Sequence, residues 1–305
     1  MPHNTMNHRP LVSIVLVNWK GLSDTLDCVR SCLTMQGPPF EIVIVDNDSQ
    51  DGSAEALTAA LGSNPAVTLL LSKQNLGYAG ANNLAITRAL DSGTDFVWLL
   101  NNDTIVNPKT LQSLVDAAAA HPRAGMLGSK ILYFDHPNTI WFAGASIQKH
   151  GNRYTVHRGF KEIDRGQYDQ IEEVEYVTGC SLLVRAATLR DIHLMPDEYF
   201  MYWEDVEWCT RARLAGWSCL YVPQSTLLHK VNSSTRGQSG LRMRYETRNR
   251  LHYLWRFDKL STLESMLCLP FSAMRSIAQK DWRSAYFPLL GVFDFLRRRT
   301  GRLPS

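Results

Sequence analysis

LVSIVLV at residues 11–17 and FEIVIV at residues 40–45 are runs rich in β-branched apolar residues, and they decide the fold. Each run is followed by polar turn residues and then by a segment with the apolar periodicity of a helix, at 22–35 and 53–61. Apolar strands that alternate with helices are typical of a sheet covered on both faces. We therefore predict an α/β fold with a mostly parallel, Rossmann-like sheet flanked by helices. Further strands are predicted at 67–71, 96–100, 177–184, 220–222 and 227–229, the last two as a short pair interrupted by Pro223.

Polar side chains follow three of these predicted strands where each strand ends. Asn18 follows the first strand, Asp46 and Asp48 follow the second, and the sequence NND at 101–103 follows the strand at 96–100. Ligands of such sheets bind at the carboxyl ends of the strands, so we expect folding to bring these residues to one edge. A carboxylate there is suited to hold a divalent cation that keeps open positions for phosphate oxygens. Each stretch taken alone is also typical of a turn or a helix cap.

The segment EYFMYWEDVEWCTRAR at residues 198–213 surrounds several acids with aromatic side chains. Paired carboxylates in a partly dry environment have split pKa values, which suits one of them to act as a general base. Glu204 and Asp205 are the candidates for such a pair. The structural alternative is that both acids favour the dipole of a helix that starts there, while Glu207 pairs with a later arginine. The aromatic density favours the functional interpretation.

The loop GYAGANN at residues 77–83 is rich in glycine and asparagine, but it matches neither the P-loop nor the GxGxxG dinucleotide motif. A nicotinamide-dependent dehydrogenase is therefore disfavoured. The amide groups of the loop are suited to bind a sugar or a phosphate, although a tight turn with an asparagine cap explains the same residues. His229 is an isolated histidine, which is more often structural than a metal ligand. It becomes a ligand candidate only if the fold returns it to Asp103.

Charge is divided unevenly along the chain. The 305 residues carry 32 Lys+Arg and 29 Asp+Glu, and this net charge of +3 argues against a dedicated nucleic-acid-binding protein. Residues 230–305 hold 15 basic and 5 acidic residues, a net of +10, which leaves −7 for residues 1–229. Basic residues beside apolar stretches fit peripheral attachment to anionic lipid, and a solvated helical face or a homodimer contact fits them equally. The basic residues are Arg242, Arg244, Arg248, Arg250, Arg256, Arg297, Arg298 and Arg299.

Composition indicates a globular cytoplasmic protein. With 45% hydrophobic and 20% charged residues, the chain is able to bury a sizeable core. The six cysteines are scattered without a CxxC pair, which favours a reducing compartment. The first ten residues do not resemble a signal peptide, and no apolar stretch is long enough to span a bilayer. We therefore expect at most a surface attachment to the inner face of the cell membrane.

Taken together, these segments resemble family 2 glycosyltransferases of the GT-A fold. The resemblance extends from about residue 11 to residue 234. The subgroup that the chain resembles most is the bacterial rhamnosyltransferase-like enzymes, which build surface polysaccharide on a polyprenyl diphosphate lipid. The matching segments are SIVLVNW (13–19), IVIVDNDSQDGS (42–53), NLGYAGANN (75–83), WLLNNDT (98–104), TGCSLLVRAA (178–187) and YFMYWEDVEWCTRARLAGW (199–217).

The resemblance implies roles for individual residues on the donor side. Val17 and Asn18 would line the nucleotide site, and Asp46 would accept a hydrogen bond from a pyrimidine base. Asp103 matches the final acid of the DxD-type motif that holds Mg²⁺ or Mn²⁺ on the donor diphosphate, and His229 matches a second metal ligand. With the polar loops included, the candidate donor-binding residues are Val17, Asn18, Asp46, Asp48, Asn75, Gly77, Asn83, Asn101 and Asn102.

On the acceptor side, Asp205 matches the catalytic base of the family's Glu-Asp pair, and Trp203 and Glu204 are candidate acceptor-side residues. Two departures from the family pattern concern the donor side. Asn101 stands where many members have the first acid of DxD, and Asp48 replaces a frequent glycine. The first departure leaves the metal dependence open.

The resemblance implies an inverting, metal-assisted glycosyltransferase that moves one sugar from a nucleoside diphosphate donor. The best candidate is L-rhamnose from dTDP-L-rhamnose, transferred to a polyprenyl-diphosphate-linked or oligosaccharide acceptor. The alternatives are a UDP-sugar-dependent transferase of the same family and a catalytically silent protein that binds sugar nucleotides or glycans. A processive synthase is disfavoured because its QxxRW motif and membrane spans have no match. The expected organisation is a polar tail at 1–10, a GT-A catalytic domain at 11–235 and a basic helical extension at 236–305.

Overall fold

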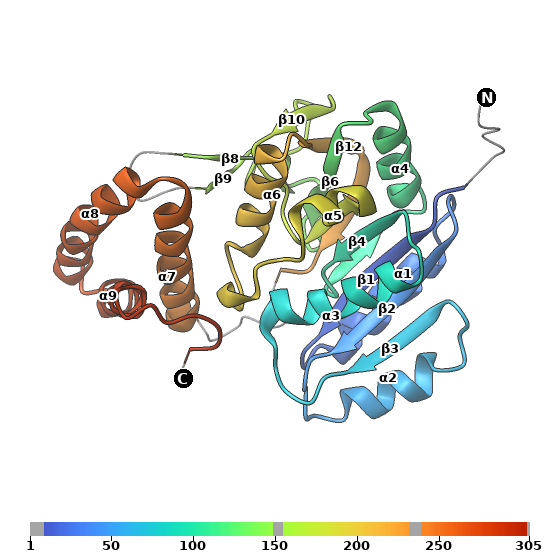
Figure 1. Cartoon of the computed structure of the whole chain (residues 1–305), viewed down its shortest axis with the longest axis horizontal. Coiled ribbons are helices and arrows are strands. Elements are labelled where there is room, and N and C mark those ends of the chain that lie inside the picture. Colours follow the sequence, from blue (N-terminus) through green and yellow to red (C-terminus); the bar gives the residue numbers. More distant parts are fainter. Residues whose placement is uncertain (1–8, 149–154, 232–238, 304–305) are drawn as a thin grey trace.

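The computed structural model describes residues 9–148, 155–231 and 239–303, in which helices flank one large sheet and three further helices lie beside it (Figure 1). The strand order is β10-β12-β6-β11-β4-β1-β2-β3, with β5 paired to β12 and β7 to β6, while β8 and β9 form a separate pair. The strands are β1 (Val12–Asn18), β2 (Phe40–Asp46), β3 (Val67–Leu71), β4 (Phe96–Leu100), β5 (Thr104–Val106), β6 (Ala124–Tyr133), β7 (Ile140–Phe142), β8 (Ala145–Ile147), β9 (Thr155–His157), β10 (Glu172–Val174), β11 (Ser181–Arg185) and β12 (Ser218–His229).

Most strands of the large sheet run in one direction. β1 is parallel to β2 and β4, β2 is parallel to β3, and β12 is parallel to β6. β11 is antiparallel to both β4 and β6, and β10 is antiparallel to β12. Along the strand order, only β10 and β11 therefore oppose the others, and the predicted mostly parallel α/β sheet is confirmed.

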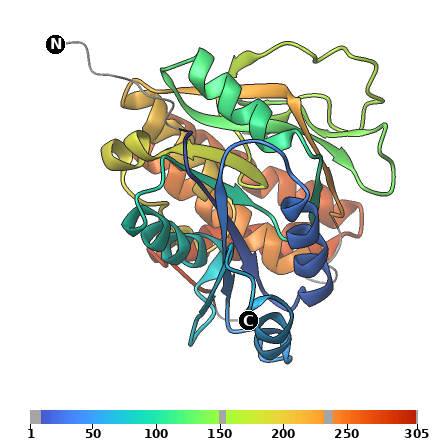
Figure 2. The ribbon, with the colours of Figure 1, turned by 90° about the vertical axis from the view of Figure 1, so that its right-hand side faces the viewer.

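Helices cover both faces of the sheet because its central strands are apolar on both sides. Ile14, Val15 and Leu16 of β1 are fully buried, although consecutive side chains of a strand point to opposite faces. α1 lies on one side of these strands and α3 on the other (Figure 2). The helices are α1 (Leu22–Leu33), α2 (Ser53–Leu61), α3 (Gly77–Asp91), α4 (Thr110–Ala120), α5 (Ala186–Ile192), the 3₁₀ turn η1 (Asp197–Tyr199), α6 (Glu204–Leu214), α7 (Ser239–Phe257), α8 (Lys259–Ala278) and α9 (Trp282–Leu296).

Three predicted strands differ from the structure. The pair of short strands predicted at 220–222 and 227–229 is wrong, because both belong to the single strand β12. Its pairing with β6 shifts register between Val222 and Thr226, and this irregularity accommodates Pro223. The strand predicted at 177–184 begins only at Ser181, after a short turn.

The predicted helical C-terminal extension is present as α7, α8 and α9, and its predicted start at residue 236 lies outside the described residues. In the described part of the chain, no helix is long and apolar enough to cross a membrane. Three arginines of α7 are neither on a solvated face nor available to anionic lipid, two of the alternatives that the sequence leaves open. Arg248 is completely buried, and Arg244 and Arg250 are 9% and 8% exposed, because α7 packs against α8 and α9 and also contacts the segment before α6.

Candidate active site

A hydrogen-bonded network joins the carboxyl ends of β1, β2 and β4. Asn18 Nδ2 donates to Asp46 Oδ2 at 2.7 Å and to Ser49 Oγ at 3.2 Å. Thr25 Oγ1 donates to Asn18 Oδ1 at 2.8 Å and accepts from Asn102 Nδ2 at 2.8 Å. Asn18 and Asp46 are both buried. The structure thus brings together Asn18, Asp46 and Asn102, three of the polar residues that were predicted to meet at this edge of the sheet.

Asn47 joins the loop after β2 to the start of α3. Its Oδ1 accepts from Leu76 N at 2.8 Å, and its Nδ2 donates to the Gly77 carbonyl at 3.1 Å and to Asn75 Oδ1 at 3.3 Å. Gly77 has a φ of +74°, and a Cβ there would lie 2.3 Å from the carbonyl oxygen of Phe200. Only glycine therefore lets α3 begin this close to the segment before α6.

The other candidate donor residues occupy different environments. Val17 is half-buried near the end of β1, Asn101 directly follows β4, and Asp48 is partly exposed with a φ of +62°. Asn83 is committed to the backbone of Met195, since its Nδ2 donates to the Met195 carbonyl at 2.8 Å and its Oδ1 accepts from Met195 N at 3.0 Å. The structure therefore gives Asn83 a connecting role between α3 and the segment before η1.

His229 at the end of β12 lies beside Asp103, which follows β4. Its Nε2 is 3.1 Å from Asp103 Oδ1, and the two residues are 6% and 8% exposed. The Trp141 ring packs edge-on against the imidazole at 4.6 Å between centroids. Burial disfavours the imidazolium, but the neighbouring Cys180 and Asp103 outweigh burial and raise the pKa of His229 to about 10. The contact with Asp103 meets the condition under which His229 becomes a metal-ligand candidate, and a cation bound there would replace the imidazolium proton.

Asp103 and His229 fit a cation that is shared with a substrate. In the described ranges, no group of three or more His, Cys, Asp or Glu side chains is arranged to hold a metal. His229 Nδ1 is buried and has no hydrogen-bond partner among the described residues. Mg²⁺ in nucleotide sites is commonly held by one or two protein carboxylates together with substrate phosphates and water. One carboxylate and one imidazole at the strand ends suit that arrangement.

Glu204 and Asp205 are adjacent buried acids at the start of α6. Asp205 Oδ2 accepts from Gly179 N at 2.9 Å, and its Oδ1 accepts from Val206 N at 2.8 Å. Glu204 is 5% exposed, and its Oε2 has no hydrogen-bond partner among the described residues. Burial and then the charge of Asp205 raise the pKa of Glu204 well above its ordinary value. Burial also raises the pKa of Asp205, but backbone N–H groups oppose that change. Glu204 is therefore the member that keeps its proton, and Asp205 is the member that ionises.

A short turn at residues 178–180 connects the acid pair to the metal candidates. Gly179 N donates to Asp205, and the Gly179 carbonyl accepts from Tyr78 Oη at 2.7 Å. The next residue, Cys180, accepts from Asn101 N at 3.0 Å and lies beside His229. The candidate base and the candidate metal ligands thus lie on either side of one turn at the carboxyl edge of the sheet.

The backbone before the acid pair is strained and is held by α7. Phe200, Tyr202 and Trp203 have φ values of +66°, +68° and +75°, a region that is costly for bulky side chains. Asn249 Nδ2 lies 3.0 Å from the Tyr199 carbonyl oxygen, 2.7 Å from that of Met201 and 2.8 Å from that of Tyr202.

Arg248, the residue before Asn249, supports the same segment. Its Nη2 donates to the Tyr199 carbonyl at 2.8 Å, and its Nη1 donates to the Gly301 carbonyl at 2.8 Å. Its guanidinium also lies over the Tyr245 ring, 4.9 Å from the centroid. Burial lowers the pKa of Arg248 to about 10. We call Arg248 and Asn249 the α7 clamp.

Other residues of the aromatic segment have structural positions. Trp203 is 8% exposed and packs against Tyr253 of α7 at 5.2 Å between ring centroids, so its indole lies in the core and not on an open acceptor surface. Glu207 is fully buried and is bonded by Tyr199 Oη and by Arg256 of α7. Some of the aromatic and acidic side chains of this segment therefore pack against α7 and do not face a substrate.

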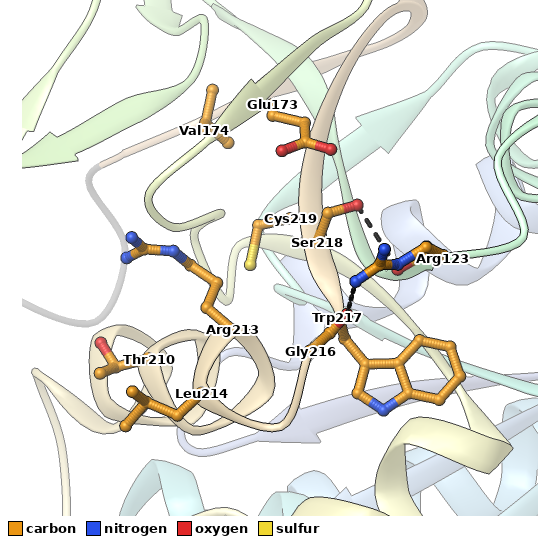
Figure 3. A pocket seen from close by; sticks show the side chains of 10 residues that line it. All are labelled: Arg123, Glu173, Val174, Thr210, Arg213, Leu214, Gly216, Trp217, Ser218 and Cys219. Atoms are coloured by element: carbon orange, nitrogen blue, oxygen red, sulfur yellow. Dashed lines mark hydrogen bonds between the residues drawn. The ribbon is translucent and has the colours of Figure 1, made fainter.

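The pocket drawn in Figure 3 is not part of this site. It lies where α6 ends and β12 begins, and Arg123 and Arg213 border it. Arg123 Nη2 donates there to the Gly216 carbonyl at 3.1 Å. His229 lies at the opposite end of the same strand. The pocket is therefore near the amino end of β12, away from the edge where the candidate residues meet.

Replacing Glu204 by glutamine is expected to stabilise the protein at neutral pH. Because the pKa of Glu204 is higher in the folded than in the unfolded state, the stability that its carboxyl contributes is present below the unfolded pKa and is lost as the pH rises through the folded pKa. Glutamine does not titrate. Urea unfolding of both proteins from about pH 4 to about pH 8 should show a growing advantage for E204Q. A constant difference across this range would contradict the assignment of a raised pKa.

Sequence reasoning missed the residues that connect the site, namely Thr25, Asn47, Ser49, Gly179 and the α7 clamp. A weak signal existed for Asn47 and Ser49, which lie inside the acidic loop after β2. No local signal exists for the clamp, because its partners lie about fifty residues before or after it and basic residues on α7 are equally typical of an exposed face.

Comparisons with known proteins point to one family. Residues 13–189 match the family described as "Glycosyl transferase family 2". Over 215 residues, 65% of this chain and 68% of the relative, the chain is 31% identical to an N-acetylglucosaminyl-diphospho-decaprenol L-rhamnosyltransferase of Mycobacterium tuberculosis. It is 22% identical to a dTDP-rhamnosyl transferase of Shigella flexneri, over 85% of this chain and 87% of the relative.

Among solved structures, a mannosyltransferase of Pyrobaculum calidifontis in complex with GDP-Man and Mn²⁺ has a similar fold. The TM-score is 0.62 with 14% sequence identity, and the match covers 96% of this chain and 89% of the other. At this level of identity, the likeness shows the fold alone.

Proposed function

This chain belongs to glycosyltransferase family 2, and we propose that it is an inverting transferase that moves one L-rhamnose unit from dTDP-L-rhamnose to a lipid-linked or oligosaccharide acceptor. The observation that carries the proposal is that two pairs of side chains lie at one edge of the sheet. One is a pair of acids, and the other is a pair of metal-ligand candidates. The acid pair Glu204 and Asp205 lies on one side of the 178–180 turn, and Asp103 with His229 lies on the other. The choice of sugar and of lipid-linked acceptor follows the names of the two relatives.

Asp205 acts as the general base in this proposal. Its carboxylate takes the proton of an acceptor hydroxyl while that oxygen forms a bond to the anomeric carbon, and the bond from this carbon to the diphosphate oxygen breaks. One displacement inverts the anomeric configuration. The Gly179 and Val206 N–H groups orient the carboxylate, and the protonated Glu204 beside it adds no second negative charge. The leaving group is a nucleoside diphosphate.

Asp103 and His229 would hold Mg²⁺ or Mn²⁺, which supplies positive charge to stabilise the leaving diphosphate. The network of Asn18, Asp46 and Asn102 forms the floor of the donor site in the same proposal. Asn101, in place of a first acid, leaves Asp103 and His229 as the two protein ligands, which is consistent with a cation completed by the donor.

The direct test of the proposed activity is transfer from dTDP-L-rhamnose to a synthetic N-acetylglucosaminyl-diphospho-lipid, followed by mass spectrometry of the product. A gain of one deoxyhexose is expected. A thermal-shift screen of dTDP-, UDP- and GDP-sugars with Mn²⁺ identifies the donor independently. Stabilisation by UDP-sugars alone would favour the UDP-sugar-dependent alternative. Donor binding without transfer or hydrolysis would favour a catalytically silent protein.

The variant H229Q is expected to weaken Mn²⁺ binding in the presence of dTDP by at least about 10-fold, because it removes one of the two protein ligands. Electron paramagnetic resonance of free Mn²⁺ measures the affinity without turnover. His121 is exposed and precedes the amino end of β6, the end of that strand opposite to the one that pairs with His229, so H121Q is the matched control. Equal Mn²⁺ affinity of H229Q and the wild type would exclude His229 as a ligand.

A further inference from the structure

The outer face of α8 is apolar along the whole helix. Its large apolar side chains recur every three or four residues, the spacing that places side chains on one face of a helix. Their exposed fractions range from 40% for Ile277 to 80% for Leu260. The residues are Leu260, Leu263, Leu267, Phe271, Met274 and Ile277.

α9 repeats the pattern at the same spacing, with exposed fractions from 43% to 65%. We call the outer faces of α8 and α9 together the apolar stripe. Twenty-one large hydrophobic side chains are exposed in the described part of the chain, and the stripe holds eleven of them. Such a concentration marks an interaction surface. The residues on α9 are Trp282, Tyr286, Leu289, Phe293 and Leu296.

The faces that these helices bury are small or polar. α8 buries mainly serine, threonine and alanine side chains, and the buried residues of α9 are Ala285, Gly291 and Asp294. A Cβ on Gly291 would lie 2.6 Å from the Arg244 carbonyl oxygen, so α9 lies directly against α7. Asp294 is fully buried, and its carboxylate accepts hydrogen bonds from Arg244 Nε at 2.6 Å and from Arg299 Nη1 at 3.0 Å. These contacts set the orientation of α9, and they reverse the usual arrangement in which a helix turns its large apolar side chains inward.

The charge around the stripe is complementary to an anionic surface. Residues 259–302 contain eight basic and three acidic residues, a net charge of +5, and one of the acids is the buried Asp294. A second copy of the chain seated on the stripe would bring two such positive regions together. An anionic lipid surface would instead pair with them and cover the apolar side chains. The basic residues, all exposed, are Lys259, Arg275, Lys280, Arg283, Arg297, Arg298, Arg299 and Arg302.

We propose that α8 and α9 dock the protein on a bilayer that contains anionic lipid, with the apolar stripe inserted into the interface. The aromatic residues Trp282 and Tyr286 suit this position, since they combine an apolar ring with a polar group. α7 packs against both α8 and α9, and the α7 clamp of the same helix holds the segment before Asp205. Docking therefore places the acceptor side of the site near the bilayer, a consequence that rests on the proposed function.

The test is flotation of the whole chain with vesicles of phosphatidylcholine, alone or with about 30% phosphatidylglycerol. The wild type is expected to bind the anionic vesicles at least about 10-fold more tightly than the neutral ones, and added NaCl should weaken the binding. The double variant L267E/F271E changes side chains that are 71% and 70% exposed, and it is expected to lose at least about 10-fold in binding. The matched control is L71E/L214E, at 58% and 74% exposed, which places the same charges away from the stripe and should bind as the wild type does.

The proposal is overturned if the wild type does not bind anionic vesicles, or if L267E/F271E binds as the control does while keeping the wild-type Tm. A dimer by light scattering that L267E/F271E disrupts, together with no vesicle binding, would show that a second copy covers the stripe and would also overturn it. Vesicle binding is measured without donor or acceptor. Its failure is therefore distinct from a failure of the proposed transfer reaction.

Discussion

Replacing Asp205 by asparagine is expected to lower kcat by about 10²- to 10⁴-fold while the dissociation constant of the donor stays the same. Asparagine has nearly the same shape and keeps an oxygen for the Gly179 N–H, but it does not accept the proton of the acceptor hydroxyl. Steady-state transfer rates and calorimetric donor binding with the wild type and D205N measure the two quantities separately.

Glu204 provides the comparison for this experiment. If Glu204 keeps its proton, glutamine reproduces its charge, and E204Q should lose far less activity than D205N. Near-normal turnover by D205N would remove Asp205 from the mechanism. A larger loss in E204Q than in D205N would mean that the two acids have exchanged roles.

Replacing Asn249 by alanine is expected to lower both stability and kcat, although the side chain lies outside the reacting groups. The change removes the side-chain donor from the Met201 and Tyr202 carbonyl groups, whereas the Tyr199 carbonyl keeps Arg248 Nη2, and we expect the free energy of unfolding to fall by about 3 kcal/mol. Release of the strained segment before Glu204 should displace Asp205. A displacement of about 1 Å is able to cost about 10²-fold in kcat. Donor binding should change less than kcat, because the donor-site network of Asn18, Asp46 and Asn102 lies at the ends of other strands.

The control for N249A is E246A on the same helix. Glu246 pairs with Arg242 at the surface, where its side chain is 38% exposed, and such a pair contributes at most about 1 kcal/mol. Urea unfolding and transfer kinetics at a temperature where both variants are folded separate stability from positioning. If N249A is destabilised but keeps the wild-type kcat, then the clamp supports the fold without positioning Asp205.

The parts of the site that the sequence predicted are those that follow from short-range rules. An apolar strand that ends in polar residues places them at the carboxyl edge of a parallel sheet, so the contact between Asn18 and Asp46 follows from β1 pairing with β2. Asp103 and His229 lie 126 residues apart, and their contact depends on β5 pairing with the end of β12. The sequence therefore predicts this pair only as a condition on the fold, because sequence spacing does not determine how β5 and β12 pair.

The C-terminal helices show why the remainder was not predictable. Arginine on a helix is typical of a solvated face, yet Arg248 is fully buried because carbonyl groups from distant segments surround it. Likewise, a helical period in α8 and α9 predicts one apolar face but not which way that face turns. Their orientation depends on small residues such as Gly291 and on the ion pair between Arg244 and Asp294.

The anomeric configuration of the transferred sugar tests the central claim most directly. The one-bond carbon–hydrogen coupling at the anomeric position, measured by NMR on the isolated product, reports that configuration. A single displacement assisted by Asp205 predicts a product whose configuration is opposite to that of the donor. A product with the donor's configuration would contradict the account.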